Sequence, residues 1–138
     1  MNKLTIAGVV VGVLILLIGG SLVAATQQGS EMSASTVLAQ NGLHWHAKLA
    51  ITEGGKVVEV PTDVGLGKVH NPIHTHEDRL IHMEFSGRVT EDDLRLENFF
   101  SAWNKEFPLG ATMTVNGKAS SELGEYVMRD GDEIAISY

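Results

Sequence analysis

Apolar and polar residues alternate along residues 42–52, which is the pattern of a β-strand that buries one face. Gly54 and Gly55 follow, and two glycines accept the positive φ angles that a tight hairpin requires. We therefore predict a β-hairpin whose return strand covers residues 57–60. The apolar positions of the first strand are Trp45, Ala47, Leu49 and Ile51, and the polar positions are His44, His46, Lys48 and Thr52.

A second alternating segment covers residues 80–85 and predicts another strand. Met83 falls on its apolar face with Ile81 and Phe85, so we expect Met83 to be a core residue rather than a copper ligand. Residues 62–78 contain two glycines and a proline, which predict an irregular connection. Two more strands are predicted near the C-terminus, at residues 111–115 and 134–138.

An amphipathic helix is predicted to begin at Thr90. Threonine is a favourable N-cap residue, and the three acidic residues that follow suit the positive end of a helix dipole. Apolar residues then recur at helical spacing, namely Leu96, Phe99, Phe100, Trp103 and Phe107. A hairpin, one helix and further strands predict an α+β fold, in which a small mixed sheet carries one helix packed on a face.

The N-terminal segment has a different character. Residues 4–25 carry no charge and, as a helix, would measure about 33 Å, close to the thickness of the bilayer hydrocarbon core. Residues 1–25 therefore predict a transmembrane anchor, or a signal segment that is cleaved to give a secreted protein. Lys3 favours a cytoplasmic N-terminus. We then expect a flexible linker at residues 26–41 and one extracytoplasmic domain at residues 42–138.

Composition narrows the classes of function. The chain has 17 Asp and Glu against 10 Lys and Arg, so a nucleic-acid partner, which needs a concentrated basic face, is not expected. It has no cysteine, which excludes disulfides, thiolate metal sites and thiol nucleophiles.

The histidines form a pattern of their own. Five of the six histidines and one carboxylate make three i, i+2 pairs, and this spacing on a strand directs both side chains to one face. Imidazole and carboxylate suit Zn(II), Cu(II), Ni(II) and Fe(II), and one ion takes about four ligands. The six residues therefore predict one ion with outer-shell partners, or two sites. His70 belongs to no pair, and its role stays open. The predicted metal-binding residues are His44, His46, His74, His76, His82 and Glu84.

These pairs predict an exported domain that captures, buffers or delivers a divalent metal, with copper first and zinc next. The metal ion is one expected partner, and the membrane, contacted through the N-terminal helix, is the other. A small metalloenzyme is the alternative, with three histidines on the metal and Glu84 as general base. Three further interpretations are a structural or interaction module on the cell surface, a pH sensor made of clustered imidazoles, and a chance arrangement.

Short motifs spread over the whole domain carry a resemblance. They are HWH at residues 44–46, NPIHTH at 71–76, IHME at 81–84, NFF with a following Trp103 at 98–103, and DGD at 130–132. In these motifs the chain resembles a group of uncharacterised, membrane-anchored or secreted prokaryotic proteins. The resemblance implies an exported domain with the histidines as its signature and implies no established activity. Such proteins commonly have His-Pro before the HTH stretch, where this chain has His70-Asn71-Pro72.

A second resemblance concerns the fold. Residues 115–118 and 130–134 resemble the closing strands of ubiquitin-like β-grasp proteins, which include small sulfur carriers. This resemblance implies a β-grasp-like arrangement of the strands and the helix. It does not imply sulfur transfer, because sulfur carriers end in Gly-Gly and this sequence ends at Tyr138.

Overall fold

The computed structural model describes residues 34–138, and the predicted anchor at residues 1–25 lies outside them. Within the described part of the chain, no helix has the length and apolar character needed to cross a membrane. The strands are β1 Val37–Ala39, β2 Leu43–Glu53, β3 Lys56–Val58, β4 Ile73–Thr75, β5 Ile81–Phe85, β6 Val89–Thr90, β7 Thr112–Val115, β8 Lys118–Ser120 and β9 Asp132–Ser137. The helices are α2 Leu96–Ala102 and the 3-10 turns η1 Asp92–Leu94 and η2 Leu123–Glu125.

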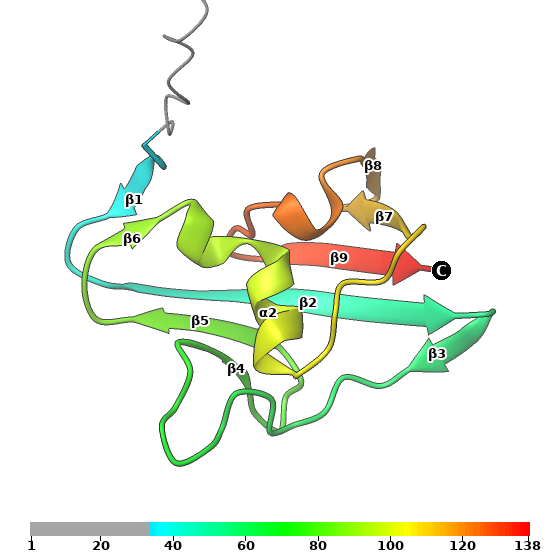
Figure 1. The fold of residues 1–138 in the computed structure, drawn as a ribbon, viewed down its shortest axis with the longest axis horizontal. Coiled ribbons are helices and arrows are strands. Elements are labelled where there is room, and N and C mark those ends of the chain that lie inside the picture. Colours follow the sequence, from blue (N-terminus) through cyan, green and yellow to red (C-terminus); the bar gives the residue numbers. More distant parts are fainter. Residues whose placement is uncertain (1–33) are drawn as a thin grey trace, which may run out of the picture. The chain divides into compact units, whose positions relative to one another are not determined.

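The long strand β2 organises the main sheet, as Figure 1 shows. Its first half pairs antiparallel with β5, and its second half pairs parallel with β9 on the other side. The strand order is β4-β5-β2-β9-β7-β8, and β3 pairs with the end of β2 in the predicted hairpin. Strands β1 and β6 form a separate two-stranded ribbon. Residues 37–39 of the expected linker thus belong to the folded part of the chain.

The alternation predicted for β2 is confirmed over residues 47–51, whereas in β5 His82 is buried together with Ile81 and Met83. Ala47, Leu49 and Ile51 are buried on one face of β2, whereas Lys48 is exposed on the other. Met83 is completely buried, as expected for a core residue. Helix α2 packs against the buried face with Leu96, Phe99 and Phe100, and the opposite face of the sheet carries the histidines.

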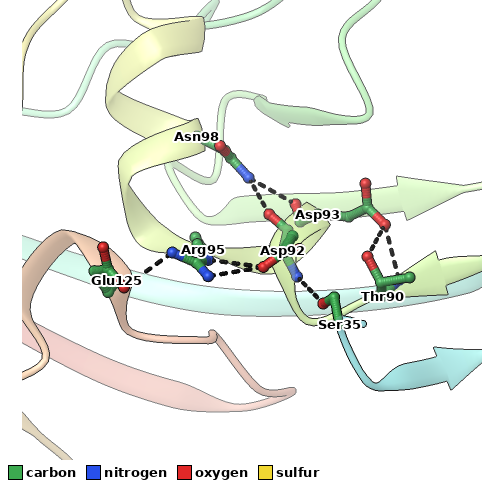
Figure 2. A network of polar contacts seen from close by, with 7 residues as sticks. All are labelled: Ser35, Thr90, Asp92, Asp93, Arg95, Asn98 and Glu125. Atoms are coloured by element: carbon green, nitrogen blue, oxygen red, sulfur yellow. Dashed lines mark hydrogen bonds and ion pairs between the residues drawn. The ribbon is translucent and has the colours of Figure 1, made fainter. Parts of the chain in front are cut away.

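The predicted helix from Thr90 is wrong in its start and its length. Thr90 ends strand β6, and its backbone N–H and hydroxyl both donate to Asp93 Oδ2, at 2.8 and 2.7 Å. Arg95 has an extended conformation, with ψ of 139°, and separates η1 from α2. Figure 2 shows the side chains that hold this break: the Asn98 amide donates to the carbonyls of Asp92 and Asp93, and Arg95 pairs with Asp92. The apolar spacing therefore continues through a segment that is helical only over Leu96–Ala102.

The expected α+β, β-grasp-like fold class is wrong. The described residues are mostly β-sheet with one short helix. Much of the difference comes from short strands such as β4, which lies inside residues 62–78, where an irregular connection was expected. A strand of three residues is too short to show a period, and its pairing with β5 depends on distant residues. Propensity and periodicity therefore understate the sheet.

Candidate metal centre

The register of three neighbouring strands gathers the histidines on one face of the sheet. His82 on β5 lies opposite His74 on β4 and opposite His46 on β2. Glu84, two residues further along β5, lies opposite His44. Because alternate residues of a strand share a face, these side chains project together from the face that α2 leaves uncovered.

His82 is the centre of this cluster. Its ring centroid lies 4.5 Å from that of His46 and 4.8 Å from that of His76. The ring of His74 stacks beside it at 5.5 Å, and that of His44 is 6.4 Å away. All six residues that the sequence singled out are therefore brought to one place, although they come from three strands and one loop.

Two groups of donor atoms result, and each is compact enough to hold a metal ion. The first comprises His74, His76, His82 and Glu84, of which His74 and His82 are buried and His76 and Glu84 are exposed. The second comprises His44, His46 and His82, of which His44 is exposed, His46 half-buried and His82 buried. In each group, one donor atom per residue lies within 4.8 Å of all the others. We call the first set the buried group, after its two buried rings, and the second set the exposed group, after His44.

Neighbouring groups fix the ring of His74 in an orientation that leaves one ring nitrogen free to bind a metal ion. Its Nδ1 lies 2.9 Å from the carbonyl oxygen of Asn71. A carbonyl only accepts, so Nδ1 carries the proton and Nε2 of the neutral ring keeps its lone pair. This Nε2 lies 3.1 Å from Nε2 of His76. Burial lowers the pKa of His74, although the Asn71 carbonyl and Glu84 act against it, and the lowered pKa favours the neutral form that binds metals.

Asn71 is held in place by the loop before β4. Its backbone N–H donates to the carbonyl of Gly65 at 2.9 Å. Gly65 has a φ of +73°, and a Cβ there would lie 2.6 Å from the carbonyl oxygen of Ile73. Only glycine allows the loop to lie so close to β4. The loop therefore places the acceptor that orients His74.

His82 is oriented from the opposite side by Asp78. Its Nε2 lies 3.0 Å from Asp78 Oδ2. Burial alone would raise the pKa of Asp78, but hydrogen bonds from the Leu80 N–H and from His82 hold it below its usual range. The ionised carboxylate accepts, so Nε2 donates, and in the neutral ring Nδ1 keeps the lone pair. Nδ1 is buried and has no hydrogen-bond partner among the described residues, and Glu84 Oε1 lies 3.6 Å away.

The spacing of these donors fits a metal ion. Around zinc, four donors at about 2.0–2.1 Å stand about 3.3 Å from one another in a tetrahedron. The two Nε2 atoms of His74 and His76 are 3.1 Å apart, and Nδ1 of His82 is 3.6 Å from Glu84 Oε1. A carboxylate or carbonyl on the far nitrogen of a histidine is also the usual support for a metal ligand.

The exposed group has the donors but less of this support. His44 Nε2 lies 3.1 Å from Glu84 Oε1, and the His44 side chain is 61% exposed, against 10% for His82. His46 is anchored by its backbone, because its N–H donates to Asp130 and its carbonyl accepts from Gly131. Within residues 34–138, no hydrogen bond holds its ring.

Two contacts of the centre leave no signal in the sequence. Asp78 and the carbonyl of Asn71 carry no spacing that marks them as partners of His82 and His74. Aspartate four residues before a histidine signals proximity on a helix, but this segment is not helical. His70 lies in neither group and is exposed, with a backbone bridge to Leu66. It borders a hollow of about 430 Å³ that His74, His76 and Glu84 also line.

Comparison with known proteins adds no family. No protein-family model matches this chain, and no curated protein or solved structure shows a significant match to it.

Proposed function

We propose that this protein binds a divalent transition metal through the clustered histidines, with the buried group as the main site. The observation that carries the proposal is Nδ1 of His82. A buried nitrogen without a partner costs about 1–3 kcal/mol relative to a satisfied one. This nitrogen lies 3.6 Å from Oε1 of Glu84, another donor of the buried group, and an ion bound beside it would give it a partner.

The donor set points to Cu(II) or Zn(II). All donors are imidazole nitrogen or carboxylate oxygen, which suit both ions, and the chain has no thiolate to select Cu(I). Affinity in such sites generally rises towards Cu(II), so copper is first and zinc next. The net charge of −7 favours the approach of cations.

The uncharged residues 4–25 and the preceding Lys3 support a domain held on the extracytoplasmic side of the membrane. Cleavage of that segment would make the domain secreted. A metal-binding domain in this position serves to capture, buffer or deliver the ion.

Titration tests the proposal. The full chain, purified in detergent and freed of metal, is titrated with Cu(II) and with Zn(II) in a calorimeter. We expect one tightly bound ion with a Kd in the micromolar range or below. His74→Gln with His76→Gln is expected to weaken this binding, whereas His70→Gln, which removes an exposed histidine outside both groups, leaves it unchanged. No heat with either ion would refute the proposal.

A metalloenzyme is the second candidate, and the hollow beside the buried group favours it. Three imidazoles can hold an ion while Glu84, on the wall of the hollow, acts as general base for a bound water. The zinc-loaded protein is assayed with activated esters and phosphoesters. Turnover that disappears in Glu84→Gln, while metal content is retained, would favour the enzyme over the binding protein.

A further inference from the structure

We propose that an ion reaches and leaves the buried group by way of the exposed pair His44 and His46, and we call this pair the exchange station. The ion stays bound to His82 while its other ligands change. This inference rests on the proposed metal binding and adds to it a route and a direction. It is carried by His82, which belongs to both groups, and by the different support that the other histidines of the two groups receive.

His82 belongs to both groups. Its Nε2 is committed to Asp78, so Nδ1 is the single lone pair that this ring offers to either group. An ion on Nδ1 can therefore be completed by the exposed pair or by His74 and His76. Changing one pair for the other moves the ion without releasing it from His82.

Glu84 is placed to follow the same movement. Its Oε1 lies 3.1 Å from His44 Nε2 and 3.6 Å from His82 Nδ1. The carboxylate thus borders both positions of the ion. Its side chain is 43% exposed, so it can turn between the two positions without disturbing the core.

The difference in support gives the route a direction. In the buried group, the orientations of His74 and His82 are fixed before an ion arrives, which lowers the ordering cost of binding. The His44 side chain is 61% exposed, and no hydrogen bond holds the ring of His46 within residues 34–138. An ion bound to water or to a small chelate can therefore gain its first protein donors at this pair. The exposed pair favours capture and the buried group favours retention.

A fixed centre of two ions is the competing arrangement. It would require each group to keep a complete set of donors at the same time. With one lone pair on His82, the exposed pair would retain only two imidazoles and a share of Glu84. The exchange station therefore predicts one tight ion per chain, whereas the fixed centre predicts two of similar affinity.

Stopped-flow kinetics on the full chain in detergent tests the exchange station, with Zn(II) and a chromophoric zinc chelator as the probes. The variant is His44→Gln with His46→Gln, and the control is Lys48→Gln with His70→Gln, which changes the same exposed face and one histidine outside the groups. We expect uptake and release in the variant to slow together by about tenfold, equivalent to about 1.4 kcal/mol on the barrier. The Kd changes by less than about threefold, because a station on the route alters both rates alike.

The outcomes separate this inference from the proposed function. Unchanged rates in the variant, or two ions of similar affinity in the unaltered chain, would overturn the exchange station and leave metal binding intact. A chain that binds no ion would overturn the proposed function first. Circular dichroism of each metal-free variant guards against misfolding, and His44→Gln and His46→Gln made singly are expected to show intermediate rates.

Discussion

The buried and exposed groups have the same kind of donor and share one ring, yet their surroundings differ. In the buried group, the Asn71 carbonyl and the Asp78 carboxylate each fix one histidine nitrogen and leave the other free. In the exposed group, Nε2 of His44 lies 3.1 Å from Glu84, and the ring of His46 has no hydrogen bond within the described part of the chain.

The difference shows that spacing along a strand brings donors together but does not make them equivalent. What distinguishes the groups is the set of contacts behind the donors, which decides tautomer and orientation. The same sheet face thus carries donors with fixed orientations at one end of the cluster and donors with less support at the other.

Replacing His82 is expected to have the largest effect, because both groups lose their common donor. His82→Gln should weaken zinc binding by at least about 100-fold, the upper end of what a change behind a ligand costs. Competition against a chromophoric chelator measures the Kd, and thermal unfolding of the metal-free protein checks that the variant folds. Retention of the original affinity would show that the two groups do not depend on His82.

The second-largest effect is expected when the pair His74 and His76 is replaced. His74→Gln with His76→Gln should weaken zinc binding by at least about tenfold more than His44→Gln with His46→Gln, since the former pair belongs to the pre-oriented group. The same competition assay measures both double variants, which remove the same number of donors. Equal losses would mean that burial and outer contacts do not rank the groups.

Asp78 offers a way to weaken the buried group without touching a donor. Asp78→Asn removes the charge that holds the proton on His82 Nε2, and we expect about tenfold weaker zinc binding. Glu77→Gln is the matched control, because it removes a neighbouring exposed carboxylate that has no hydrogen bond or ion pair among residues 34–138. If both variants lose affinity equally, net charge rather than the Asp78 contact is responsible.

Part of the centre follows directly from the sequence. Alternation in the two longer strands places two pairs on the face of the sheet away from core residues such as Met83. These pairs are His44 with His46, and His82 with Glu84. This reasoning needs only the two-residue period of a strand. It holds because those strands are long enough to show the period.

The rest depends on pairing between distant segments. Nothing in the pattern around His74 reveals β4, whose three residues follow a loop rich in glycine, and nothing local gives the register that sets His74 opposite His82. The Asp78 contact is likewise a product of the tertiary fold. The predicted helix is too long because apolar residues recur at helical spacing beyond Ala102, where α2 ends.

The smallest expected effect is a pH dependence of stability in the metal-free protein, which tests whether His74 is held as a neutral ring. Burial lowers the pKa of His74, so the unfolded chain takes up the proton more readily than the folded chain. Stability should be complete above the ordinary histidine pKa of about 6.5 and should fall as the pH drops from there through the folded pKa. Urea unfolding between pH 5 and 8 measures the slope, and His74→Gln should flatten it more than His70→Gln. An equal slope in both variants would show that the surroundings of His74 do not set it apart from a histidine outside the cluster.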